Sequence, residues 1–209
     1  TPNTEIDFCG HATLAALSLI DYKEMDIELK SFKLKAFKDP LPRFNSDDGM
    51  IIETYIDELA VCNSLGISIN DVGPKGMSIA YAGLNDLFIH VNNIDSLTPN
   101  FELIKEISKD LDVIGYHVYA NHSEYDATTR NFAPLYGINE ESATGSANAG
   151  LAYLMSLDCE KKKFKFLQGE TMNKKSEIII HIDDRIYISG EASLIDTVSV
   201  LEEEYVKTK

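Results

Sequence analysis

The segment from Gly137 to Gly150, GINEESATGSANAG, constrains the fold more than any other part of this chain. Two carboxylates, Glu140 and Glu141, precede a Thr-Gly-Ser turn, and small residues after the turn lead into the apolar run 151–157. This order predicts a helix that begins at Gly145, whose first backbone N–H groups have no partner inside the helix. Such a helix start attracts anions. An ordinary helix cap, with acidic residues placed before it, is the alternative interpretation.

A second segment near the N-terminus has the same design. In FCGHATLAAL, residues 8–17, a glycine follows a short apolar segment, and a polar side chain then precedes small residues that begin a predicted helix. Two such turns predict two similar halves. The two tetrapeptides that can be superposed are Cys9-Gly10-His11-Ala12 and Thr144-Gly145-Ser146-Ala147.

Four stretches carry a resemblance to a known family. They are Glu5 to Leu17, Arg130 to Pro134 leading to Gly137-Ile138, Glu141 to Ser146, and Gln168-Gly169 through Met172. In this order and at these spacings the chain, from about Thr1 to Ala192, resembles the PhzF-like (phenazine biosynthesis-like) family. The resemblance implies the diaminopimelate epimerase fold: an α/β (α+β) protein of two similar domains, each a curled mixed sheet around a central helix. The active site would lie in the cleft between the domains.

The resemblance also implies which residues form that site. The best understood members isomerise a small cyclic carboxylic acid by general acid/base proton transfer without a cofactor. The family's aspartate is replaced here by Glu141, whose side chain is one methylene longer, and proton-transfer geometry could differ. The expected catalytic residues are His11, Glu141 and Ser146, and the expected substrate-binding residues are Cys9, Gly10, Ala12, Thr144, Gly145 and Ala147.

In the family, the principal base is a glutamate on a strand upstream of the Cys-Gly-His motif, in a segment that would precede Thr1. We therefore expect the first domain to be incomplete and the chain alone to be inactive or nearly so. The expected division is an N-terminal domain 1–75, a C-terminal domain 76–195 and a polar tail 196–209. Residues 67–77, which contain Gly73-Pro74-Lys75-Gly76, are expected to connect the domains.

Local patterns predict several further elements. Residues 27–37 alternate between apolar and polar side chains, which predicts one half-buried strand, bulged near its middle. Residues 58–65 read as a short helix that ends at Gly66. Residues 99–111 place Phe101, Ile104 and Ile107 on one face, as an amphipathic helix does.

Charge and composition restrict the classes of partner. The 209 residues carry a net charge of −15, which argues against nucleic acid or an anionic membrane surface as a partner. No apolar run approaches the roughly 20 residues that span a bilayer. Cys9, Cys62 and Cys159 have neither paired nor metal-site spacing, which favours the cytoplasm. No metal, flavin or nucleotide motif is present. We expect a small carboxylic acid as ligand, no cofactor, and, from the resemblance, a homodimer.

Several residues invite a second interpretation. Cys9 would be a base or nucleophile if its thiol had a lowered pKa at a helix start, but Thr144 cannot serve as its partner in a two-thiol racemase. Arg130 would bind a carboxylate or form a structural salt bridge. His117 and His122 are interpreted as surface histidines, and His90 and His181 as structural ones.

Three functions therefore stay open. The first is the cofactor-independent isomerase or epimerase described above. The second is a binding protein of the same fold that keeps the anion-binding helix starts and performs no chemistry. The third is a catalyst rebuilt around Cys9 as its base.

Overall fold

The computed structural model describes residues 9–29, 33–46, 48–192, 194 and 196–197. The elements are α1 Gly10–Leu19, β1 Glu24–Glu28, β2 Lys33–Lys38, β3 Pro42–Asn45, β4 Met50–Ile52, α2 Glu58–Leu65, η1 Ile69–Asp71, β5 Val72–Tyr81, β6 Asn85–Val91, η2 Ile94–Ser96, α3 Phe101–Asp110, β7 Tyr116–Ala120, β8 Ala127–Ala133, η3 Pro134–Tyr136, β9 Ile138–Glu141, α4 Gly145–Ser156, β10 Lys163–Gln168, η4 Glu170–Met172, β11 Ser176–Ile182 and β12 Ile186–Ser189.

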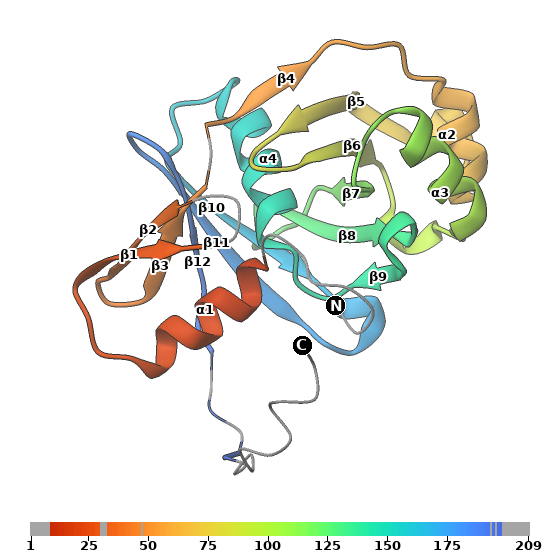
Figure 1. Cartoon of the computed structure of the whole chain (residues 1–209). Coiled ribbons are helices and arrows are strands. Elements are labelled where there is room, and N and C mark those ends of the chain that lie inside the picture. The colour runs from red at the N-terminus through yellow and green to blue at the C-terminus, as the bar shows by residue number, and fades with distance from the viewer. Residues whose placement is uncertain (1–8, 30–32, 47, 193, 195, 198–209) are drawn as a thin grey trace.

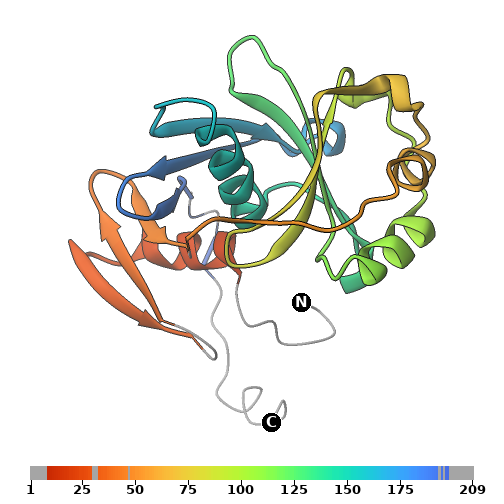
Figure 2. The ribbon, with the colours of Figure 1, turned by 90° about the horizontal axis from the view of Figure 1, so that it is seen from above.

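The strands form one curled sheet in the order β1-β2-β3-β12-β11-β10-β8-β7-β6-β5-β4, with β9 paired to β8 beside this path. Strand β8 runs parallel to β10, and β6 runs parallel to β7. The sheet wraps around α4, which contacts β11 and β12 on one side and β5 and β6 on the other (Figure 1). Helix α1 packs on β3 and reaches α4, and the view from above shows α2 and α3 on the far side of the sheet (Figure 2).

Helix α4 is buried because its residues are small or apolar on every side. Residues 147–152 are all buried. A Cβ atom at Gly150 would lie 2.5 Å from Cζ of Phe88, so glycine permits the close approach of α4 to β6. The matching helix α1 is equally apolar, but it buries Leu17 and leaves Leu19 exposed.

Two hydrophobic clusters lie on opposite faces of the sheet. One surrounds α4 and includes Phe88, Leu151 and Ile180. The other lies beneath α2 and α3 and includes Leu87 and Ile104. Phe88 and Leu87 are neighbours in β6 and belong to different clusters, because successive side chains of a strand point to opposite faces.

Four predicted helices are confirmed, and the first of them, α1, begins at Gly10 in the segment that is predicted to contain it. Helix α2 ends at Gly66, which has φ of 68° and accepts the left-handed conformation that ends the helix. Helix α3 lies within the predicted range 99–111, and α4 begins at Gly145 as predicted.

One prediction about a strand is wrong. Residues 27–37 do not form one bulged strand, because β1 and β2 pair as an antiparallel hairpin in which Glu28 faces Lys33. Alternation continues through both arms of a hairpin, so periodicity alone does not locate the turn. Residues 67–77, which are predicted to connect the domains, contain η1 and the first part of β5, where the pairing with β6 shifts register between Val72 and Met77. The Gly and Pro residues there mark a bulge.

The predicted domain boundary at 75 and 76 falls inside β5, and the division into domains stays a prediction. Most of the predicted polar tail, 196–209, lies outside the described residues. Among the described residues, no helix combines the length and apolar character that crossing a bilayer requires.

Candidate functional site

At the start of α4, the side chain of Thr144 does not cap the helix. Thr144 precedes the helix in an extended conformation and makes no side-chain cap hydrogen bond. Its hydroxyl instead donates to Oε2 of Glu141 over 2.8 Å. The plain-cap interpretation of Thr144 is therefore wrong. Gly145, Ser146 and Ala147 form the first turn, whose backbone N–H groups have no acceptor within the helix.

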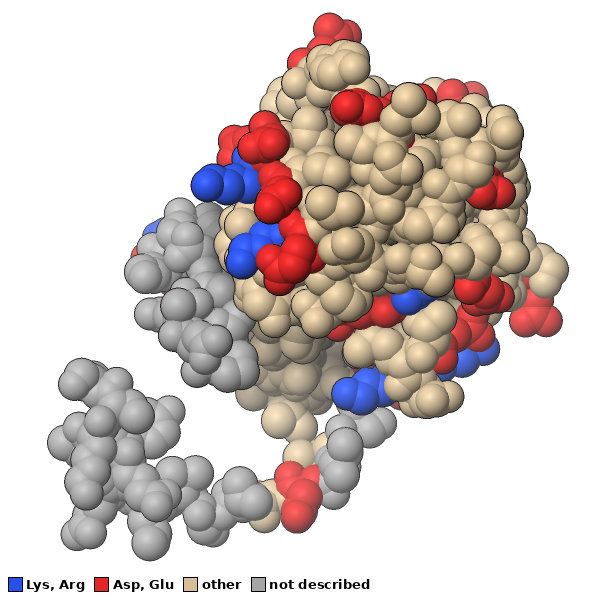
Figure 3. Space-filling view, turned by 90° about the vertical axis from the view of Figure 1, so that its right-hand side faces the viewer, with Lys and Arg blue, Asp and Glu red and all other residues tan. Residues whose placement is uncertain are grey.

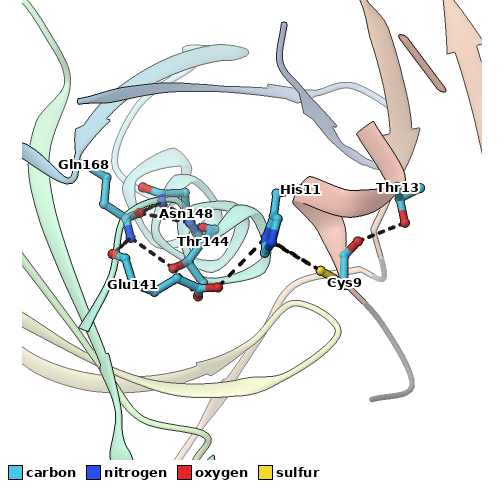
Figure 4. A network of polar contacts seen from close by, with 7 residues as sticks. All are labelled: Cys9, His11, Thr13, Glu141, Thr144, Asn148 and Gln168. Carbon is cyan, nitrogen blue, oxygen red and sulfur yellow. Dashed lines mark hydrogen bonds and ion pairs between the residues drawn. The ribbon is translucent and has the colours of Figure 1, made fainter. Parts of the chain in front are cut away.

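A buried glutamine fixes the direction of that hydrogen bond. Nε2 of Gln168 donates to the backbone oxygen of Glu141 over 2.7 Å and to Oγ1 of Thr144 over 3.0 Å. Its Oε1 accepts from the backbone N–H of Thr144 and from Nδ2 of Asn148. Because Thr144 Oγ1 accepts a hydrogen bond from the Gln168 amide, its own hydroxyl hydrogen points to the Glu141 carboxylate (Figure 4).

The network continues to a fully buried histidine. Nε2 of His117 lies 3.3 Å from Oδ1 of Asn148, and Nδ1 lies 3.0 Å from Oδ1 of Asn131. Burial lowers the pKa of His117 to about 4, against the smaller opposing effect of the Asn131 and Asn148 side chains, whose oxygens favour the charged ring. The prediction of a surface histidine is wrong here, because β7 is buried on both faces. His90 is buried, as its structural interpretation requires, and stacks on Tyr119.

The start of α1 brings the second set of predicted residues to the same place. Cys9 precedes the helix, and Gly10, His11 and Ala12 form its first turn. Nδ1 of His11 lies 3.9 Å from Oε1 of Glu141, with side-chain exposures of 61% and 25%. Sγ of Cys9 lies 3.5 Å from Nε2 of His11. His11, Glu141, Cys9 and Thr144 are thus joined by contacts across the two helix starts (Figure 4).

Ser146 lies one residue into α4, and its side chain is partly buried. The structure therefore places all nine predicted residues in the first turns of α1 and α4 or immediately beside them. The roles of these residues stay predictions.

Of the two roles considered for Arg130, binding a carboxylate ligand or forming a structural salt bridge, the structure shows the salt bridge. Its Nε and Nη2 donate to the two carboxylate oxygens of Glu140 over 2.8 and 2.9 Å, and Thr171 donates to the same carboxylate. Burial alone would raise the pKa of Glu140. The hydrogen bonds from Arg130 and Thr171, with the charge of Arg130, together hold it below its usual value. Arg130 thus ties β8 to the segment that carries Glu141.

Sequence reasoning missed Asp86 and the role of Gln168. Asp86 is 3% exposed, and burial together with the negative charge of Glu141 raises its pKa to about 7. The sequence does contain a signal for Asp86: it directly precedes the apolar run Leu87–Ile89, and an acidic residue in a buried strand is unusual. For Gln168, the signal in the sequence is its position: this side-chain amide directly follows the mostly apolar stretch 164–167.

Among the described residues, no group of three or more His, Cys, Asp or Glu side chains could hold a metal ion. A surface hollow of about 300 Å³ is lined by the β5–β6 turn, the end of α3 and η3, and it includes none of the nine predicted residues.

Comparison with known proteins gives a consistent result. A family model described as phenazine biosynthesis-like protein matches residues 51–197. An "uncharacterized isomerase" from Clostridium acetobutylicum is 30% identical over 228 residues, which cover 93% of this chain and 75% of that protein. A phenazine biosynthesis-like domain-containing protein from Bos taurus is 24% identical over 214 residues and covers 93% and 73% of the two chains.

Solved structures share the fold. The crystal structure of a PhzF-family protein from Bacillus anthracis has a TM-score of 0.78 at 19% identity and covers 91% of this chain and 75% of that one. A phenazine biosynthesis PhzC/PhzF protein from Clostridium difficile has a TM-score of 0.71 at 26% identity and covers 96% and 76%.

Proposed function

Because the chain belongs to the phenazine biosynthesis-like family, we propose that it is an isomerase that moves a proton on a small carboxylic acid without a cofactor. The observation that supports this most directly is the approach of His11 Nδ1 to Glu141 Oε1 at 3.9 Å. An imidazole and a carboxylate at this separation, both partly exposed, can pass a proton through a bound molecule.

The two helix starts would hold the substrate. Backbone N–H groups in the first turns of α1 and α4 lie at the positive ends of two helix dipoles. They would bind the carboxylate and stabilise the negative charge that develops when a neighbouring carbon loses its proton. Ser146 would orient a substrate oxygen.

His11 and Glu141 would relay protons in this reaction. The Thr144 hydroxyl holds one oxygen of Glu141, which leaves the other oxygen facing His11. The family resemblance assigns the principal base to a glutamate upstream of the Cys-Gly-His motif. On the same basis we propose that the site lies in an interdomain cleft of a cytoplasmic homodimer with a biosynthetic role.

Proton exchange in deuterated water tests the proposal. A panel of small carboxylic acids, each with a C–H bond next to the carboxyl group or to a C=C bond, is followed by NMR. The 209-residue chain and the product of the complete reading frame that encodes it are both assayed. We expect catalysed exchange of one class of acid, slowed about 100-fold or more by Glu141→Gln or His11→Asn. Glu177→Gln, on an exposed ion pair of β11, is the matched control.

Each contrary result has a meaning. Exchange that survives Glu141→Gln and stops in Cys9→Ala would assign the base to the thiol. Acids that bind but never exchange, in either polypeptide, would overturn the isomerase proposal in favour of a binding protein.

A further inference from the structure

Two buried side-chain amides near Glu141 have orientations that backbone groups fix. Nδ2 of Asn148 donates to the backbone oxygen of Thr144 over 2.9 Å. Nε2 of Gln168 donates to the backbone oxygen of Glu141 over 2.7 Å, and its Oε1 accepts from the backbone N–H of Thr144 over 3.2 Å. A backbone oxygen only accepts and a backbone N–H only donates, so neither amide can be turned around without losing these bonds.

The orientation of Asn148 bears on where His117 carries its hydrogen. Oδ1 of Asn148 lies 3.3 Å from Nε2 of His117. Because this oxygen only accepts, the contact is a hydrogen bond only if Nε2 carries hydrogen. Burial favours the neutral ring, which has a single N–H. A neutral ring with its hydrogen on Nε2 satisfies the contact and leaves Nδ1 bare.

Asn131 lies on the other side of the ring and has a freedom that Asn148 lacks. Its Oδ1 is 3.0 Å from Nδ1 of His117, and no hydrogen bond to another described residue fixes its side chain. A half-turn of this amide presents Nδ2 to the bare Nδ1 and keeps the shape of the side chain. With the hydrogen on Nδ1 instead, Nε2 of His117 and Oδ1 of Asn148 would face each other as two buried acceptors, which is unfavourable.

Every donor in the resulting chain of hydrogen bonds points toward Glu141. Nε2 of His117 donates to Asn148, and Nδ2 of Asn148 donates to Oε1 of Gln168 over 2.8 Å. Nε2 of Gln168 donates to the Thr144 hydroxyl over 3.0 Å, and this hydroxyl donates to Oε2 of Glu141 over 2.8 Å (Figure 4). The first three side chains are fully buried, so water does not compete for their bonds. Hydrogen bonds that follow one another in this way polarise each other.

We propose that His117, with its hydrogen on Nε2, is the far end of a one-way hydrogen-bond chain that holds the Glu141 carboxylate in place for proton transfer. This inference rests on the proposed function. His117 and Asn148 are then positioning residues, which act through the side chains between them and Glu141. No proton travels along the chain, because its amides keep fixed directions. The chain holds Oε2 of Glu141 and leaves Oε1 facing His11.

The position of the hydrogen on His117 can be measured without any substrate. Long-range ¹H–¹⁵N NMR spectra of the ¹⁵N-labelled chain at pH 7 distinguish a protonated ring nitrogen from a bare one. The signals that disappear in His117→Gln assign this ring. We expect hydrogen on Nε2 and none on Nδ1. Hydrogen on Nδ1, or on both nitrogens, would overturn the proposal.

Two variants of His117 test whether the chain acts on Glu141. Leucine has no donor, whereas the side-chain amide of glutamine can donate to Asn148 as the ring does. In His117→Leu we expect the side-chain NH₂ resonances of Gln168 to shift. The kcat for proton exchange should fall by about 2- to 30-fold, with KM nearly unchanged. His117→Gln should restore both readouts toward wild type, and His122→Leu, which removes a histidine outside the chain, is the control.

The contrary results are distinct. Normal kcat in His117→Leu, or equal losses in His117→Leu and His117→Gln, would overturn the positioning role. If His117→Leu does not fold, the hydrogen position in the wild type and the kcat of His117→Gln still decide. If no acid exchanges its proton while the NMR results are as expected, the proposed function and the positioning role lose support, and the hydrogen-bond chain stands.

Discussion

At the scale of single residues, the hydroxyl of Thr144 has one direction available to its proton. Gln168 donates to Thr144 Oγ1, and the Glu141 carboxylate accepts from it. The arrangement makes the hydroxyl a fixed donor to Glu141. The Gln168 amide is fully buried and takes part in five hydrogen bonds, which hold its orientation.

Thr144→Val removes this donor and keeps the side-chain shape. A hydrogen bond to a charged group contributes about 1.5–3 kcal/mol, so we expect catalysed proton exchange to fall by about 10- to 100-fold. Thr144→Ser, which keeps the hydroxyl, should recover most of the rate. Thr128→Val on β8 is the control, and an equal loss in both valine variants would contradict the assigned role.

His117 predicts how stability depends on acid. In the unfolded chain a histidine takes up a proton near pH 6.5, whereas the folded chain resists it down to about pH 4. The unfolded state therefore binds more protons in this window, and stability is lost as pH falls from 6.5 to 4. The contribution is about 3 kcal/mol over the whole window.

Urea unfolding at pH 4.5, 5.5, 6.5 and 7.5 measures this loss. We expect the free energy of unfolding of His117→Gln to fall less steeply with acid than that of the wild type. Asp86 changes the unfolding free energy in the opposite direction, because its raised pKa lowers stability as the pH rises from 3.8 toward 7. Both proteins contain Asp86, so its contribution cancels when their curves are compared. His122→Gln is the control; a curve for His117→Gln parallel to wild type would refute the argument.

At the scale of elements, the β8–β9 pair carries Glu141 and is held by one ion pair. Arg130 and Glu140 are 11% and 16% exposed, and Arg130 also lies over the ring of Phe132. Strand β9 has four residues and a register shift against β8, so few backbone hydrogen bonds hold it. The side-chain pair therefore contributes much of what fixes this segment.

Arg130→Met leaves the Glu140 carboxylate without its cation in a largely buried place. Removing one partner of such a pair costs about 3 kcal/mol of unfolding free energy. Lys165→Met breaks the ion pair with Glu177, in which the two side chains are 45% and 41% exposed. This change should lower the unfolding free energy by less than about 1 kcal/mol. Urea unfolding compares the two variants, and similar losses in both would show that the Arg130 pair is not special.

At the scale of the whole molecule, acidic side chains outnumber basic ones by 34 to 19. Figure 3 shows acidic side chains spread over one face, with few basic ones among them. These negative charges repel one another more strongly in the compact state than in the unfolded chain. Stability should therefore depend on ionic strength.

Raising NaCl from 10 mM to 200 mM screens this repulsion. We expect the melting temperature at pH 7 to rise by about 2–4 °C, which corresponds to about 1 kcal/mol for a chain of this size. Thermal unfolding followed by circular dichroism measures the shift. Near pH 4.6, the isoelectric point, the shift should vanish. A shift of equal size at both pH values would point to a salt effect unrelated to net charge.

The sequence by itself determined the parts of this protein that depend on neighbouring residues. The Thr-Gly-Ser turn located the start of α4, Gly66 located the end of α2, and apolar periodicity located α3. The matched helix starts also indicated the family and the residues that gather between α1 and α4. Capping, glycine conformation and helical periodicity act within a few residues, so one contiguous segment contains their cause.

Only the tertiary structure decided which polar groups are buried and with whom. His117 and Asp86 lie in strands whose alternation does not say that both faces are covered. Gln168 meets Glu141 because β10 lies beside β8, and Arg130 selects Glu140 because β8 pairs with β9. These partners are far apart or on different strands, and burial depends on what every other element covers. Pairing and burial are therefore properties of the assembled sheet.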